Sequence, residues 1–180
     1  MNFVPTELPE VVVVEPKVFG DSRGFFMEVF HEARFAEAGL PTVWKQDNIS
    51  RSQKNVLRGL HFQLTQPQGK LVRCLRGAIY DVAVDVRRSS PTFGKWVGVE
   101  ITEENRRAIY VPVGFAHGFC VLSDLADVEY KCTDLYAPQH ERSLIWNDPT
   151  VGVKWPLSGE PQLSPKDLIG KPLAELECYP

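Results

Sequence analysis

Glycine and proline interrupt this chain along its whole length, and their spacing constrains the fold more than any other feature of the sequence. The 180 residues include 13 glycines and 14 prolines. Short segments bounded by these residues are typical of β-strands joined by turns, not of long helices. The clearest is 78–86, where Ala78, Tyr80, Val82, Val84 and Val86 share one face. The other predicted strands are 11–15, 25–30, 44–51, 57–63, 71–75, 96–100, 108–111, 118–122, 128–135 and 143–146.

Helices are few in this pattern. One is predicted at 31–38, a segment that Gly39 and Pro41 end. About ten strands without regular alternation of strand and helix indicate an all-β sandwich or barrel and argue against a parallel α/β sheet. We expect a single domain over residues 1–180, because this length suits one hydrophobic core. Residues 149–180 are rich in proline and are predicted to wrap over the barrel in extended form, with a helical turn near 166–169.

Charge and cysteine usage narrow the class of protein. With 20 basic and 23 acidic side chains the net charge is −3, which argues against a nucleic-acid-binding protein. No apolar run approaches the roughly 20 residues of a membrane helix, so no membrane association is expected. The first residues do not have the pattern of a secretory signal. The four cysteines form no C-x-x-C pair and suit reduced thiols, which favours a cytoplasmic protein.

Two of the four histidines lie in strand-like segments and are candidates for chemistry. Arg58 and His61 are three positions apart, so in a regular strand their side chains would point to opposite faces. A bulge or turn near Gly59 is needed to bring both side chains to one face. His117 lies in the segment Pro-Val-Gly-Phe-Ala-His-Gly. Taken singly, a histidine in a strand is more often a hydrogen-bonded structural residue than a functional one.

The spacing of Pro112, Gly114 and His117 resembles the second histidine motif of the cupin superfamily, whose members are jelly rolls built as a double-stranded β-helix. In the first motif of that superfamily, Gln63 stands here in place of a histidine and Lys70 in place of a glutamate. An ammonium group cannot ligate a metal and repels it. The resemblance implies an all-β, cupin-type jelly roll with short peripheral helices, a site without metal, and imidazoles available for acid–base chemistry.

A longer series of motifs resembles the dTDP-4-dehydrorhamnose 3,5-epimerase family over residues 11–171. Each motif alone is modest evidence, but their number and order are specific. The family inverts C3 and C5 of a dTDP-linked 4-keto-6-deoxyhexose, and the resemblance implies no cofactor. The motifs are DSRGFFME (21–28), QDNIS (46–50), VLRGLHFQ (56–63), PQGKLVR (67–73), DVAVD (81–85), SPTFG (90–94), PVGFAHGF (112–119), YK (130–131), WNDP (146–149) and LSPKD (163–167).

The resemblance also implies roles for individual residues. His61 is expected to be the base, with Asp167 orienting its imidazole and stabilising its protonated form. Tyr130 is expected to be the acid on the opposite face of the sugar, its charged form helped by a nearby cation, while Lys70 stabilises the enolate oxygen. The residues implied in substrate binding are Arg23, Glu28, Gln46, Asp47, Asn48, Arg58, His117, Glu141 and Lys166.

Simpler interpretations exist for the same residues. Without the resemblance, Tyr130 reads as a core aromatic, Lys70 as a solvated loop residue, Asp167 as part of a helix start and Arg23 as a turn charge. The resemblance further implies a homodimer in which Arg23 and Glu28 act across the interface. Three alternatives stay open: a monofunctional 3- or 5-epimerase of an antibiotic-sugar pathway, a metal-dependent cupin oxygenase, and a nucleotide-sugar-binding module without catalysis.

Overall fold

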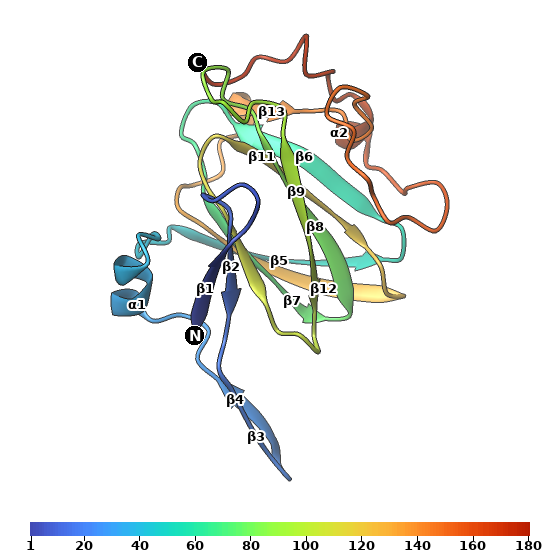
Figure 1. Ribbon diagram of the computed structural model, residues 1–180. Helices are drawn as coiled ribbons and strands as arrows, with labels where there is room; N and C mark the ends of the chain where they lie inside the picture. The colour runs from blue at the N-terminus through green and yellow to red at the C-terminus, as the bar shows by residue number, and fades with distance from the viewer.

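The computed structural model describes all 180 residues and contains two antiparallel β-sheets that face each other (Figure 1). The all-β jelly roll predicted from the sequence is confirmed. Its strands are β1 Asn2–Pro5, β2 Val12–Glu15, β3 Val18–Asp21, β4 Gly24–Met27, β5 Gln46–Gln53, β6 Leu57–Gln63, β7 Lys70–Arg76, β8 Ala78–Asp85, β9 Trp96–Thr102, β10 Ala108–Val111, β11 Phe115–Val121, β12 Leu125–Cys132 and β13 Glu141–Ser143; the helices are α1 Glu32–Glu37, the 3₁₀ turn Pro138–His140 and α2 Pro165–Leu168.

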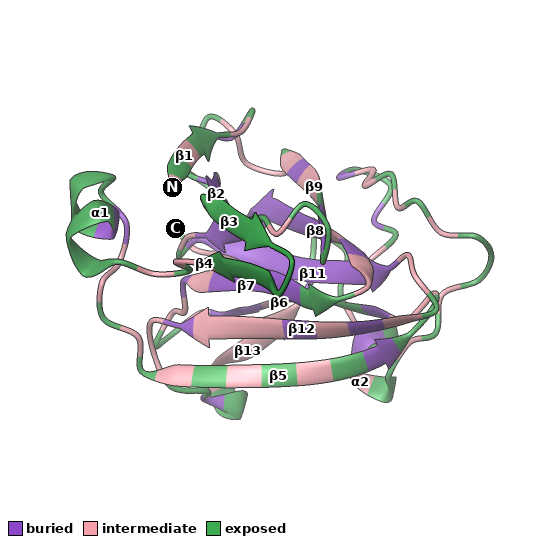
Figure 2. Cartoon of the chain, turned by 90° about the horizontal axis from the view of Figure 1, so that it is seen from below, coloured by how far each residue is buried: buried purple, intermediate pink, exposed green.

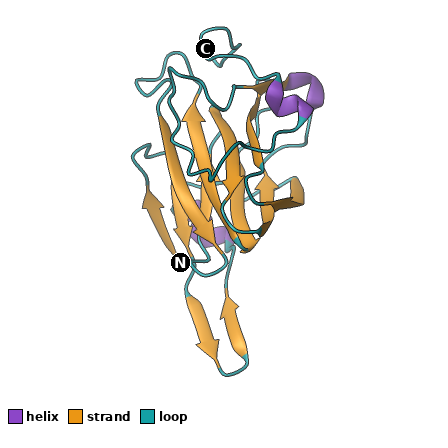
Figure 3. Cartoon of the chain, turned by 90° about the vertical axis from the view of Figure 1, so that its right-hand side faces the viewer, coloured by secondary structure: helices purple, strands orange, loops and turns teal.

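The chain crosses repeatedly from one sheet to the other. The six-stranded sheet has the order β1-β2-β10-β7-β12-β5, and the five-stranded sheet has the order β13-β6-β11-β8-β9. From β5 to β8, and again from β9 to β13, consecutive strands lie in opposite sheets, which is the connectivity of a jelly roll. The β3–β4 pair is separate and projects from the body as a hairpin (Figure 3).

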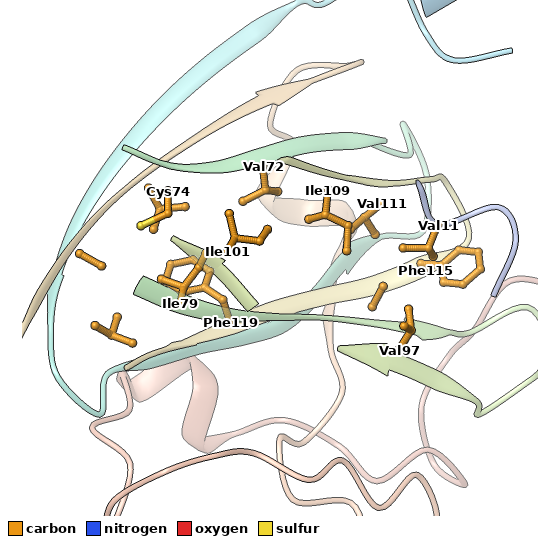
Figure 4. Close-up of a cluster of buried hydrophobic side chains, with 14 of the residues drawn as sticks. Val11, Val72, Cys74, Ile79, Val97, Ile101, Ile109, Val111, Phe115 and Phe119 are labelled. Carbon is orange, nitrogen blue, oxygen red and sulfur yellow. The ribbon is translucent and has the colours of Figure 1, made fainter. Parts of the chain in front are cut away.

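Apolar side chains from both sheets fill much of the space between them. Figure 4 shows this core, to which β8 contributes Ile79 and β11 contributes Phe119. The opposite face of β8 is also buried, because Val82 and Val84 pack beneath the C-terminal segment. The alternation predicted for 78–86 is therefore present, and both of its faces are covered. Burying each such side chain contributes about 1.5–3 kcal/mol.

Different parts of the chain cover parts of the outer faces of the sheets, while most of β5 is exposed or half-buried (Figure 2). Residues after Asp148 run over the five-stranded sheet, where Leu173 and Leu176 are buried. On the other sheet, Phe35 of α1 is fully buried. That helix ends at Glu37, and Gly39 shortly after it has a φ of 71°, the left-handed conformation that commonly follows a helix. No helix of the structure combines the length and the apolar character that crossing a membrane requires.

Several predicted strand ends were wrong, and local turn chemistry explains the clearest cases. The strand predicted at 128–135 is β12, which leaves the sheet after Cys132, where the Asp134 carboxylate accepts the amide hydrogen of Leu135. The strand predicted at 118–122 begins earlier, directly after Gly114, because that glycine adopts a φ of 94° and makes the turn. The segment predicted at 143–146 pairs only over 141–143, and β1 and β3 were not predicted.

Candidate active site

A polar cavity lies between the two sheets. It consists of two adjoining hollows of about 210 and 260 Å³, and His61, Lys70, Tyr130 and Lys166 line both. Sites for small organic ligands typically measure about 300–1,000 Å³, so the combined space suits such a ligand. The predicted site residues that line it are Gln46, Asn48, Arg58, His61, Lys70, His117, Tyr130, Glu141, Lys166 and Asp167.

An irregularity in β6 brings Arg58 and His61 to the same cavity. His117 of β11 lies opposite His61, but the residue two positions further along β11 lies opposite Arg58, so β6 carries one extra residue. Gly59 permits this, since its φ is 121° and a Cβ there would lie only 2.5 Å from the Cα of Gly118. The bulge predicted near Gly59 is confirmed.

His61 lies against Asp167. Nε2 of the imidazole is 2.9 Å from Oδ1 of the carboxylate, although its N–H does not point straight at that oxygen; the contact becomes an ion pair when the imidazole takes up a proton. Asp167 is almost fully buried and accepts the Gly59 amide at 3.1 Å and the Ser164 hydroxyl at 2.5 Å. The Asp167 side chain thus caps the start of α2 and also lies where it can orient the His61 imidazole. With Nε2 committed to Asp167, Nδ1 is the nitrogen free for substrate.

Burial and hydrogen bonding set the charges of this pair. Burial lowers the pKa of His61, and the nearby Asp167 only partly opposes the shift. Burial alone would raise the pKa of Asp167, but the close contact with His61 and the hydrogen bonds from Ser164 and the Gly59 amide lower it. At neutral pH the imidazole is therefore uncharged and able to accept a proton, while the carboxylate beside it is negative.

Tyr130 and Lys70 lie on neighbouring strands of the facing sheet. Tyr130 of β12 pairs with Val72 of β7, two residues along the same strands from the pairing of Cys132 with Lys70. Burial raises the pKa of Tyr130, and the positive charge of Arg58 opposes this shift without cancelling it. The cation expected beside the phenol is present, yet the phenol keeps its proton at neutral pH. Burial also lowers the pKa of Lys70, whose ammonium forms no ion pair.

His117 is held by a buried carboxylate that was not predicted as a site residue. Its Nε2 lies 2.9 and 3.0 Å from the two carboxylate oxygens of Asp81, which is fully buried on β8. Asp81 opens the DVAVD segment, but strand alternation alone gave no sign that its partner would be His117, 36 residues away. The contact fixes the imidazole orientation at the cavity wall.

Glu141, Lys166 and Tyr136 form another wall of the cavity. The Tyr136 hydroxyl donates to one oxygen of Glu141 at 2.9 Å, and the ammonium of Lys166 contacts the other. The Tyr136 amide donates to Oε1 of Gln46 at 2.7 Å. Tyr136 was not predicted from the sequence because it follows the end of a strand, where no periodic pattern marks it. Its ring is half-exposed, so it offers a flat surface to a ligand.

Asp47 does not reach the cavity. Side chains alternate along β5, so Gln46 and Asn48 face inward while Asp47 faces outward and forms an ion pair with Lys131 at 2.7 Å. The Asp47 side chain therefore does not line this cavity within one chain, and its role in substrate binding stays a prediction.

Arg23 and Glu28 also lie outside the cavity. Arg23 is at the turn of the β3–β4 hairpin, is strongly exposed and pairs with Asp21. Glu28 follows β4 and pairs with Arg34 at 2.5 Å. A single chain does not bring these two residues to His61, which is compatible with the expectation that they act across an interface.

Comparison with known proteins identifies the family. The sequence model described as dTDP-4-dehydrorhamnose 3,5-epimerase matches residues 5–175. The chain belongs to the dTDP-4-dehydrorhamnose 3,5-epimerase family. The curated dTDP-4-dehydrorhamnose 3,5-epimerase of Pseudomonas aeruginosa is 54% identical over 174 residues, which cover 96% of each chain.

Relatives of this chain carry names that describe different specificities. A Legionella pneumophila dTDP-6-deoxy-D-glucose-3,5-epimerase, crystallised with dTDP-4-keto-L-rhamnose, has a TM-score of 0.95 at 52% identity and covers 98% of this chain and 94% of its own. A Streptomyces niveus dTDP-4-dehydrorhamnose 3-epimerase is 41% identical over 97% of this chain and 85% of its own. The resemblance to the epimerase family found in the motifs is thus confirmed over nearly the whole chain.

Proposed function

We propose that this chain inverts C3 and C5 of dTDP-4-dehydro-6-deoxyglucose and so produces dTDP-4-dehydro-L-rhamnose. One observation carries the proposal: a neutral imidazole backed by a carboxylate, a protonated phenol and an unpaired ammonium line the same cavity. C3 and C5 both flank the C4 ketone, which acidifies their hydrogens because the resulting carbanion delocalises as an enolate. Such a reaction needs a base, an acid and a stabilised oxyanion.

Each step has a group suited to it. Nδ1 of His61 takes the proton from carbon, and Asp167 stabilises the imidazolium that forms. The electron pair of the C–H bond moves onto the C4 oxygen, where the ammonium of Lys70 stabilises the enolate. Tyr130 then delivers its proton to the opposite face of the same carbon as the ketone reforms. Proton exchange with water restores His61 and Tyr130, so each inversion introduces one hydrogen from solvent.

The rest of the cavity suits the nucleotide. Arg58 and Lys166 supply cations for the diphosphate, because guanidinium and ammonium groups bind phosphate oxygens strongly. His117 adds a further donor, held in place by Asp81. The exposed face of Tyr136 suits stacking with the thymine base. Gln46, Asn48 and Glu141 offer the polar atoms that a base edge and a ribose need.

The proposal is tested by incubating the chain with dTDP-4-dehydro-6-deoxyglucose in heavy water and reading each carbon by proton NMR. Loss of signal at both C3 and C5 is expected, with the L-rhamno product appearing. His61→Ala should lower the rate by several orders of magnitude while keeping nucleotide affinity. No exchange at either carbon would contradict the proposal and favour a binding module without catalysis.

A monofunctional epimerase is the second candidate, since the Streptomyces niveus relative is named a 3-epimerase. The higher identity to relatives named 3,5-epimerases favours inversion of both carbons. Exchange at a single carbon in the same assay would decide for the monofunctional enzyme.

A metal-dependent oxygenase is disfavoured by the donor set. No three His, Cys, Asp or Glu side chains gather so that they could hold a metal. Lys70 also places a positive charge in the cavity, where it would repel a cation. Stoichiometric iron bound through His61 and His117 would overturn this argument.

We further infer a homodimer in which the β3–β4 hairpin completes the partner's site. Phe19, Phe25 and Phe26 on this hairpin are between 53% and 70% exposed, an unusual apolar surface for a projecting element. Mixing inactive His61→Ala and Arg23→Ala proteins tests the inference. In mixed dimers one site combines an intact His61 with an intact Arg23 from the other chain, so activity should return. Sedimentation as a monomer, or no recovery on mixing, would contradict the inference.

A further inference from the structure

Gln63, at the end of β6, directs its whole amide group to two loops beside the cavity. Its Nε2 donates to the carbonyl oxygens of Gln66 at 2.6 Å and Leu135 at 3.2 Å. Its Oε1 accepts the amide hydrogen of Ala137 at 2.8 Å. Gln63 is 3% exposed, so water does not compete for these bonds. Both donors and one acceptor of the amide are therefore used on backbone groups.

The two loops carry groups that face the ligand space. The carbonyl of Gln66 belongs to the loop that leads into β7 and its first residue, Lys70. Gln66 has a φ of 53°, a left-handed conformation that is uncommon for a residue other than glycine. Leu135 and Ala137 flank Tyr136, whose ring lines the cavity. Gln63 thus joins the loop before the lysine to the loop that bears the tyrosine.

Few other side chains can make these bonds from this position. A glutamate offers no donor when ionised and would face two carbonyl oxygens with a negative charge. A neutral histidine has one donor and one acceptor, so it could make at most two of these three bonds. At the position that resembles a metal-binding histidine in the cupin motif, this chain has a glutamine, which can make all three bonds at once.

We propose that Gln63 is a positioning residue for nucleotide binding, acting through Tyr136 and the loop before Lys70. The proposal rests on the proposed function, because the ligand is taken to be a thymidine diphosphate sugar. Holding a binding wall in place before the ligand arrives increases affinity by lowering the ordering cost of association. The side chains assigned to the chemistry are held by other contacts: His61 lies against Asp167, and Tyr130 and Lys70 lie in the paired strands β12 and β7. Loss of Gln63 should therefore weaken binding more than it slows the chemical step.

The experiment compares Gln63→Glu and Gln63→Met with the unchanged protein. Titration calorimetry with dTDP measures the dissociation constant, and deuterium exchange at saturating substrate measures kcat. Thermal unfolding verifies that each variant is folded at the assay temperature. Gln162→Glu is the matched control, because Gln162 is exposed, donates to the Lys54 carbonyl at 3.0 Å and does not line the cavity.

The dissociation constant of dTDP, and with it KM, is expected to rise about tenfold or more in both Gln63 variants, which corresponds to about 1.4 kcal/mol. kcat should stay within about threefold of the unchanged protein, and Gln162→Glu should match that protein in both quantities. A rise below fivefold in folded variants, or a larger loss in kcat than in affinity, would overturn the positioning role.

A measurement on the unchanged protein keeps the proposal testable if neither variant folds. The amide hydrogen of Ala137 should exchange slowly, since its acceptor is the buried Oε1 of Gln63. Rapid exchange of this hydrogen would overturn the role assigned to Gln63. If the unchanged protein neither binds dTDP nor exchanges substrate hydrogen, the proposed function fails instead, whatever the Ala137 result.

Discussion

Replacing Asp167 with asparagine removes the charge that supports His61, and it puts an NH2 group in place of the oxygen that accepts from the Ser164 hydroxyl and amide. The carboxylate oxygen lies 2.9 Å from Nε2 of His61, and an asparagine oxygen can still accept the Gly59 amide. At an effective dielectric constant of about 20, unit charges at this separation interact by about 5–6 kcal/mol. The imidazole is 18% exposed and its N–H is imperfectly aimed, so we take about half, roughly 3 kcal/mol, as the stabilisation of the imidazolium.

A loss of about 3 kcal/mol corresponds to a fall in kcat of about 10²-fold, since each 1.4 kcal/mol is a factor of ten. The rate of deuterium incorporation at C3 and C5 under saturating substrate measures this fall directly. Ser164→Ala is the matched control, because it removes the hydroxyl that caps α2 through Asp167 but keeps the carboxylate charge. The control is expected to lose about 1 kcal/mol of stability and less than threefold in kcat.

The reasoning about Asp167 is refuted by either of two results. Asp167→Asn could retain the rate of the unchanged protein, in which case the charge does not support the base. Alternatively, Ser164→Ala could lose as much rate as Asp167→Asn while remaining folded, in which case the carboxylate acts only as a helix cap.

Three further predictions follow from the charges of the site and the core. Tyr130→Phe should abolish net inversion yet allow some wash-out of substrate hydrogen, because the base remains; normal inversion by NMR would show that Tyr130 is not the acid. In a pH profile, the acid fall of kcat/KM should occur only below the ordinary histidine pKa of about 6.5, because burial lowers the pKa of His61. The alkaline fall of kcat/KM should begin below about 10.5, because burial lowers the pKa of Lys70. An acid limb above 6.5 would contradict the assignment of His61 as a buried neutral base. Burial opposes ionisation of Asp85, but hydrogen bonds led by that from Arg87 lower the pKa of Asp85 to about 2. The ionised Asp85 therefore stabilises the folded protein above about pH 4, and this contribution is lost as the pH falls towards 2. Asp85→Asn should therefore lower the free energy of unfolding by about 2 kcal/mol at neutral pH and flatten its decline in acid, and an unchanged acid unfolding curve would count against this ion pair.

Local patterns were sufficient for much of the fold. Alternation over 78–86 predicted a strand, and its two faces contact two separate apolar clusters. The three-residue spacing of Arg58 and His61 predicted an irregularity at Gly59, because side chains in a regular strand alternate between its two faces. Such inferences succeed where the physical constraint acts between residues that are adjacent in sequence.

Other features depend on contacts between distant segments, and no local pattern contains them. Gln46 and Asp47 are both polar, so the sequence did not show which of them faces the cavity. Tyr136 gains its place through Gln46 and Glu141, and Gln63 bonds residues up to 74 positions away. The hairpin with Arg23 is exposed in one chain, and its proposed role requires a second chain.

A crystal structure of the protein with dTDP-glucose, which lacks the C4 ketone and does not react, tests the central claim most directly. The account predicts that the hexose lies between Nδ1 of His61 and the hydroxyl of Tyr130, with C3 and C5 within reach of both and the C4 substituent beside Lys70. A hexose bound away from these two side chains, or a metal ion held between His61 and His117, would contradict it.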